Sequence, residues 1–144
     1  MINKLKDDIN MRPELFFFSG CIPKEDIIQK LSFMNINVPF ALIELWNEIG
    51  GGEMFETETI LSPIANSDLG DDIESVNYYH YKKGLSKDFF VFHVGLGGIS
   101  AVSLNDERYV IIDETNYKCV KWFESLEKWY ENHIRKEYEI KYNL

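Results

Sequence analysis

The segment from residue 36 to residue 55 contains a complete helix signal followed by an abrupt stop, and it constrains the fold more than any other stretch. Asn37 can cap the helix, and Pro39 falls in its first turn, where a fixed φ suits a helix and a missing N–H costs nothing. An apolar stripe at helical spacing follows, made of Leu42, Leu45, Trp46 and Ile49. The helix is then expected to end at a run of three glycines, Gly50, Gly51 and Gly52. Glycine adopts a positive φ at little conformational cost, so it commonly ends helices. The segment predicts an amphipathic helix that packs on one face and leads into a strand beginning at Glu53.

The rest of the chain predicts one α+β domain that spans residues 1–144. Helical spacing recurs over residues 23–35, 68–84 and 120–138, and apolar runs typical of strands occupy residues 53–63, 89–94, 99–104 and 109–113. Short turns between the last three strands favour an antiparallel meander. We therefore expect a mainly antiparallel sheet packed against an N-terminal helical hairpin and a long C-terminal helix.

The composition narrows the classes of function. Twenty-four acidic and fifteen basic residues give a formal charge of −9, which repels nucleic acid and anionic membranes and favours basic partners. The apolar run at residues 15–18 is too short to cross a bilayer or to form a signal-peptide core, so we expect a cytoplasmic protein with no membrane partner. The oligomeric state stays open.

Few residues are arranged for catalysis or metal binding. His80, His93 and His133 lack the spacing of a zinc site, and His93, in an apolar strand, is interpreted as a core or rim histidine. The glycines of residues 95–98 precede a strand rather than a helix, which indicates a hairpin turn and not a phosphate loop. Cys21 and Cys119 are interpreted as reduced, buried structural thiols. We expect no enzyme activity, no catalytic residue, no metal and no cofactor.

Several segments together resemble the SUKH superfamily, whose members include fungal regulators of cell-wall synthesis and many bacterial immunity proteins. The resemblance rests on Pro39 after an apolar lead-in, on a helix that ends in residues 45–48, and on the Gly51-Gly52 pair. The order of elements, the later glycine-rich turn and a terminal helix beginning near residues 121–124 extend it over residues 22–135. The lead-in is Val-Pro rather than Leu-Pro, and the stop is Ile-Gly-Gly-Gly rather than Asn-Gly-Gly. The motif by itself also fits any amphipathic helix with a glycine cap.

The resemblance implies a non-enzymatic domain that binds a protein, most simply an immunity protein that neutralises a cognate toxin. Charge complementarity favours a basic toxin domain, for which a nuclease is one candidate. The residues expected to bind the partner are acidic side chains with two tyrosine anchors: Glu53, Glu56, Glu58, Asp71, Asp72, Glu74, Tyr78 and Tyr79. The acidic runs also fit a merely solvated face, and Trp46 is a further possible anchor whose place in the stripe favours the core.

Two alternatives remain open from the sequence. A regulatory or scaffold domain of the same fold would bind a host protein in the absence of any toxin. A small enzyme or metabolite-binding protein would instead need a deep pocket with convergent polar groups.

Overall fold

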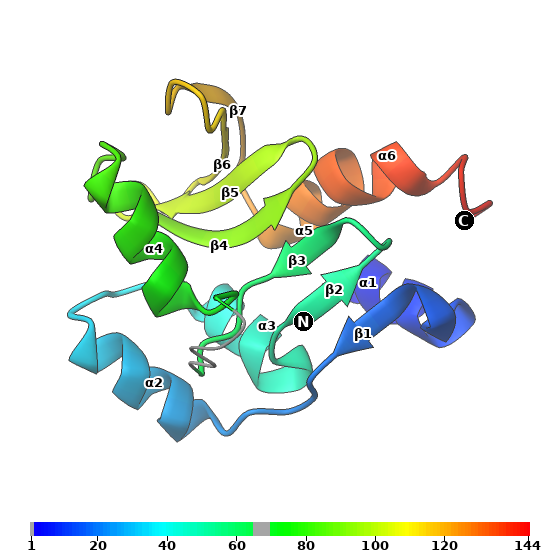
Figure 1. Cartoon of the computed structure of the whole chain (residues 1–144). Helices are drawn as coiled ribbons and strands as arrows, with labels where there is room; N and C mark the ends of the chain where they lie inside the picture. The colour runs from blue at the N-terminus through cyan, green and yellow to red at the C-terminus, as the bar shows by residue number, and fades with distance from the viewer. Residues whose placement is uncertain (1, 65–69) are drawn as a thin grey trace.

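The computed structural model describes residues 2–64 and 70–144, and its centre is a seven-stranded antiparallel sheet (Figure 1). The strands follow one another in chain order across the sheet, so every neighbour in space is also a neighbour in sequence. The strands are β1 (Phe16–Phe18), β2 (Gly52–Met54), β3 (Glu58–Ile60), β4 (Phe89–Gly95), β5 (Gly98–Ser103), β6 (Tyr109–Ile112) and β7 (Cys119–Phe123). The α+β class and the antiparallel meander predicted from the sequence are confirmed.

Helices cover the sheet and connect its halves. In the view of Figure 1, α4 lies at one side of the sheet and the C-terminal helical segment at the other. The helices are α1 (Asn3–Met11), α2 (Lys24–Phe33), α3 (Phe40–Ile49), α4 (Ile73–Lys82), α5 (Leu126–Trp129) and α6 (Lys136–Tyr138), with a π-helical stretch at Tyr130–Arg135 between the last two and a short 3₁₀ turn at Pro13–Leu15. No helix in the described ranges is both long and apolar enough to cross a membrane.

Helix α3 and the glycines after it follow the sequence prediction closely. All four residues of the apolar stripe are buried, and Trp46 donates its indole N–H to the carbonyl of Leu61 at 2.9 Å. Gly50 ends the helix with a φ of +71°. A Cβ at Gly52 would lie 2.1 Å from the carbonyl oxygen of Phe17, so this glycine lets β1 approach β2. Trp46 is thus a core residue and not a partner anchor.

The start of α3 differs from the prediction. Pro39 rather than Asn37 occupies the cap position, and the helix begins at Phe40. Asn37 lies two residues too early for its side chain to reach the first free N–H groups of this helix.

The C-terminal helix also begins later than expected. Residues 119–123 form the edge strand β7, with Trp122 paired to Val110 of β6 and 52% exposed. Ser125 caps the helix by accepting the N–H of Lys128 at 3.1 Å. The prediction failed because Phe123 and Leu126 match helical spacing by chance, whereas the valine and tryptophan before them fit an extended edge strand.

The N-terminal residues form two elements that the sequence analysis did not predict, α1 and β1. Asp8 of α1 is buried and accepts hydrogen bonds from Tyr130 at 2.7 Å and from Arg135 at 2.8 Å. This charge-assisted contact fastens the first helix to the C-terminal segment. The two cysteines, expected to be buried, are free and exposed; Cys21 precedes α2 and Cys119 begins the outer strand of the sheet.

Candidate functional site

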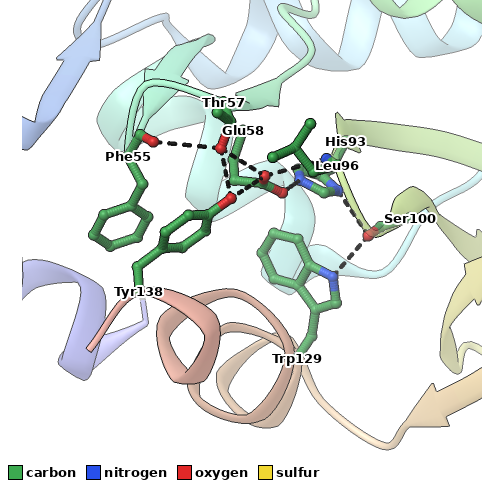
Figure 2. A network of polar contacts seen from close by, with 8 residues as sticks. All are labelled: Phe55, Thr57, Glu58, His93, Leu96, Ser100, Trp129 and Tyr138. Carbon is green, nitrogen blue, oxygen red and sulfur yellow. Dashed lines mark hydrogen bonds and ion pairs between the residues drawn. The ribbon is translucent and has the colours of Figure 1, made fainter. Parts of the chain in front are cut away.

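A chain of buried polar side chains joins the sheet to the C-terminal segment (Figure 2). His93 of β4 lies 2.9 Å from a carboxylate oxygen of Glu58 through Nε2 and 2.8 Å from the hydroxyl of Ser100 through Nδ1. Trp129 donates its indole N–H to the same hydroxyl at 2.9 Å. One arrangement of protons satisfies the whole chain: Trp129 donates to Ser100, Ser100 to His93, and His93 to Glu58.

The second carboxylate oxygen of Glu58 faces the turn between β4 and β5 and the C-terminal helix. It accepts a hydrogen bond from the hydroxyl of Tyr138 at 2.6 Å and one from the N–H of Leu96 at 3.3 Å. Thr57 places its hydroxyl 3.0 Å from this oxygen. Glu58 therefore fastens three separate parts of the molecule: β4, the turn that follows it, and the last helix.

Electrostatics keeps Glu58 ionised and His93 neutral. Burial by itself raises the pKa of Glu58, but hydrogen bonds from His93 and Tyr138 outweigh burial and lower that pKa to about 2. Burial lowers the pKa of His93, against the opposing pull of the Glu58 carboxylate. At neutral pH the site thus holds one negative charge with no cation to balance it inside the network.

Ser100, His93 and Glu58 are the residue types of a hydrolase triad, but their placement does not suit nucleophilic attack. Ser100 is fully buried, and its oxygen already accepts the indole N–H of Trp129. A nucleophile must reach a substrate atom, and here side chains cover the hydroxyl on all sides. Ser100 is therefore not placed as a nucleophile, and the network holds Glu58 in position.

The turn from Gly95 to Gly98 is shaped around this carboxylate. A Cβ at Gly95 would lie 1.9 Å from Oε1 of Glu58, and one at Gly97 would lie 3.3 Å from the His133 ring. Gly98 alone of the three glycines has positive φ, at +113°. The hairpin turn predicted from the sequence is confirmed, but at Gly95 and Gly97 the reason for glycine is close approach rather than positive φ.

Two hollows flank this turn, and Leu96 stands between them with 80% of its surface exposed. The first has a volume of about 320 Å³ and is lined by Glu58, Leu96, Gly97, His133, Glu137 and Tyr138. The second has a volume of about 350 Å³ and is lined by Gly95, Leu96, Gly97, Gly98, Asp113, Glu114, Thr115 and Val120. We call the two hollows and Leu96 the turn face.

The turn face is acidic. Its described lining holds four carboxylates and no lysine or arginine, and the carboxylates belong to Glu58, Asp113, Glu114 and Glu137. Burial and the neighbouring His93 lower the pKa of His133 to about 4, so this imidazole adds no positive charge at neutral pH. Lys121 approaches from β7, where its ammonium lies 5.2 Å from the centre of the Phe123 ring.

The structure divides the predicted acidic surface. Glu53 and Glu56 are exposed around the β2–β3 hairpin, as expected of a binding surface, and Glu56 accepts a hydrogen bond from Tyr142 at 3.0 Å. Glu58 is 3% exposed and Asp72 is 1% exposed, so the prediction of both as surface residues is wrong. Glu58 alternates inward with Ile60 on a strand, and Asp72 caps α4 by accepting the N–H of Ser75 at 2.9 Å.

The other predicted residues lie on or near α4. Asp71 is partly buried before the helix, and Glu74 forms an ion pair of 2.7 Å with Lys30. Tyr78 and Tyr79 are exposed, but the ammonium groups of Lys82 and Lys83 lie over their rings, at 4.9 Å and 4.7 Å from the ring centres. The tyrosines thus belong to a locally basic helix face rather than to an acidic one. Asp68 and Leu69, which the sequence placed at the start of this helix, lie outside the described residues.

Of the residues of the turn face, only Glu58 was predicted to bind a partner. Leu96 could have been found as a lone large apolar residue in a glycine turn, where hydrophobic side chains are rarely needed for packing. Nothing in the sequence places Asp113, Glu114 and Glu137 beside it, because they come from a later turn and from the last helix.

Comparison with known proteins assigns no function to the site. No protein-family model matches the sequence, and no curated protein matches it. Within the described residues, no three histidine, cysteine or acidic side chains gather in a way that would hold a metal ion.

Proposed function

We propose that this chain is a non-enzymatic binding module that receives a basic protein partner on the turn face. The observation that carries the proposal is an exposed leucine between two hollows whose described lining holds four carboxylates and no lysine or arginine. An apolar tip surrounded by charge of one sign has the composition of a docking surface, because the leucine supplies buried area and the charges select the partner.

Two further features support this surface. The network around Glu58 holds a carboxylate ionised beneath the turn, where it needs no reorganisation when a partner arrives. The formal charge of −9 would steer a basic protein toward the molecule and speed the encounter. The proposal keeps Glu58, as the buried carboxylate beneath the turn, and replaces the rest of the predicted surface, since Tyr78 and Tyr79 lie among lysines on α4.

The finer part of the proposal is that the partner is a toxin and that this chain is its immunity protein. The resemblance of residues 22–135 to the SUKH superfamily supports it, together with the α+β fold and the acidic surface. A regulatory or scaffold role, in which a host protein occupies the same face, is the alternative. The two differ in what the partner does when it is expressed alone.

Charge reversal tests the binding surface. The double variant Glu114→Lys, Glu137→Lys changes one exposed carboxylate in each hollow, and Glu53→Lys, Glu56→Lys makes the same change of charge on the β2–β3 hairpin. The purified chain would capture its partner from the native host, and association would be timed in a salt series. We expect a basic partner, slower association at higher salt, and loss of binding only in the first double variant.

Equal binding by both double variants, loss only in the hairpin variant, or a partner without net positive charge would refute the turn face as the docking surface. The toxin assignment has its own test. The captured partner is expected to arrest growth when expressed alone and to be harmless when co-expressed with the wild-type chain. A partner that is harmless by itself would favour the regulatory alternative.

A further inference from the structure

The hollow between Glu58 and Glu137 has a more specific use than the turn face as a whole. We infer that it receives the positively charged end of one arginine or lysine side chain of the partner, an inference that rests on the proposed function. Its volume of about 320 Å³ lies at the small end of the range for ligand pockets, roughly 300–1,000 Å³. A space of this size suits one side chain rather than a folded segment.

The charges around the hollow favour a cation. Glu58 forms its floor and stays ionised, with only 4% of its side chain exposed. Glu137 is an exposed residue of the last helix and provides a second carboxylate at the rim. Two carboxylates that line one partly enclosed hollow attract a cation more strongly than either would alone.

The remaining walls fit the other parts of such a side chain. His133 is neutral at physiological pH and therefore offers a ring nitrogen without competing charge. Leu96 gives an apolar surface on which the methylene groups of arginine or lysine can pack while the charged end points inward. Tyr138 closes the hollow and is held in place by its hydrogen bond to Glu58.

The glycine turn keeps this space open. A side chain at Gly95 would collide with the Glu58 carboxylate, and one at Gly97 would press on the His133 ring. The backbone therefore passes close to both polar groups and leaves Leu96 as the side chain that projects from the turn. An entering side chain meets this leucine first and the carboxylates behind it.

Short peptides test the inference without knowledge of the partner. The probes are acetyl-Gly-Arg-Gly-amide, the same peptide with lysine, and the same peptide with citrulline, which has the shape of arginine without its charge. Binding would be followed by NMR titration of the backbone amides of residues 95–98 and of the His133 ring. We expect saturable shifts with arginine and lysine and none with citrulline.

Glu137→Gln is expected to weaken peptide binding about fivefold, in line with the loss of one partly exposed ion pair. The residue is exposed, so this variant keeps its fold, whereas Glu25→Gln on α2 is the matched control and should bind as the wild type does. Equal shifts with citrulline, shifts spread over other surfaces, or no effect of Glu137→Gln would overturn the inference.

The outcomes separate the inference from the proposed function. If the arginine peptide does not bind but charge reversal on the turn face abolishes partner binding, the docking surface stands and the side-chain pocket is wrong. If the peptide binds in the hollow but no basic partner depends on the turn face, the pocket stands and the proposed function is wrong.

Discussion

Glu58 keeps its charge in a place where burial alone would favour the neutral acid. Hydrogen bonds from His93, Tyr138 and the N–H of Leu96 compensate for the lost water and bring its pKa to about 2. Hydrogen bonds to a carboxylate are stronger than those between neutral groups. If the carboxylate is removed, each buried donor is left without an acceptor, which destabilises the folded state. The same residue therefore fastens the turn and supplies the charge on which the proposed binding depends.

Replacement of Glu58 by glutamine should be costly. The amide has one acceptor oxygen instead of two and places its NH₂ group against groups that already donate hydrogen bonds. We expect Glu58→Gln to lower the free energy of unfolding by about 3 kcal/mol. Urea denaturation measures this, with Glu56→Gln as the exposed control, which should change stability by less than about 0.5 kcal/mol. Equal effects of the two substitutions would show that the buried network contributes little.

The glycine turn offers a second comparison between neighbouring residues. Gly95→Ala would bring a methyl group to 1.9 Å from the Glu58 carboxylate, whereas Gly97→Ala would bring one to 3.3 Å from the His133 ring. We expect the first to cost more than about 2 kcal/mol and the second less than about 1 kcal/mol, because the Glu58 side chain is held by its partners and cannot withdraw. Thermal or urea unfolding checks the order, and a Gly95→Ala variant as stable as Gly97→Ala would contradict it.

Among the elements, those whose periodicity was continuous were predictable from sequence. The stripe of α3 and the apolar strands β4 to β6 carry strong signals, and all are found within a few residues of their expected bounds. The short edge strands β1 and β7 were missed because strands of this length rely on one neighbour for their hydrogen bonds, and their sequences show no clear alternation.

The boundary between β7 and the last helix can be tested with its two tryptophans. Trp129 is fully buried and donates to Ser100, whereas Trp122 is half exposed on β7, where Arg108 lies 4.0 Å from the centre of its ring. We expect Trp129→Phe to lower the free energy of unfolding by about 3 kcal/mol, through a cavity and a lost donor, and Trp122→Phe to change it by less than about 0.5 kcal/mol. Urea unfolding followed by circular dichroism measures both. Similar losses of stability in the two variants would show that Trp122 is buried in the core. That result would agree with a helix over residues 120–138 and contradict the edge strand β7.

The candidate site was less predictable than the elements that build it. The sequence identified an acidic chain and a glycine turn, but it favoured acids that are close together along the chain, such as Glu53, Glu56 and Glu58. Alternation along a short strand turns the third of these inward. The carboxylates that do gather, Asp113 and Glu137 among them, are brought together by the order of the strands and the path of the last helix, which no local pattern encodes.

At the scale of the whole molecule, the excess of negative charge is unevenly distributed. The turn face carries carboxylates without lysine or arginine in its described lining, while Lys82 and Lys83 lie over the tyrosines of α4. In Figure 1 α4 and the C-terminal helix that contributes Glu137 lie at different sides of the molecule. The β6–β7 turn that carries Asp113 and Glu114 lies nearer to α4, since the hydroxyl of Tyr117 and Nδ1 of His80 are 2.9 Å apart. The hollow lined by Glu58 and Glu137 therefore favours a basic group more than the tyrosines of α4 do, and this difference orients a basic partner as well as attracting it.

His133 and Glu58 together set how stability responds to pH. Burial, His93 and Lys121 lower the pKa of His133 from 6.5 to about 4, although the Glu58 carboxylate acts in the opposite direction. The pKa of Glu58 is lowered from 4.5 to about 2. The unfolded chain then takes up protons at a higher pH than the folded chain, so stability is full above pH 6.5 and is lost as pH falls. The share of His133 is roughly 2 kcal/mol, allowing for its partial exposure, and is lost between pH 6.5 and 4. Urea unfolding at pH 7, 5.5 and 4 should show that the free energy of unfolding falls with pH. In His133→Gln this free energy should fall less steeply. A free energy of unfolding that stays constant or rises toward pH 4 would contradict the prediction.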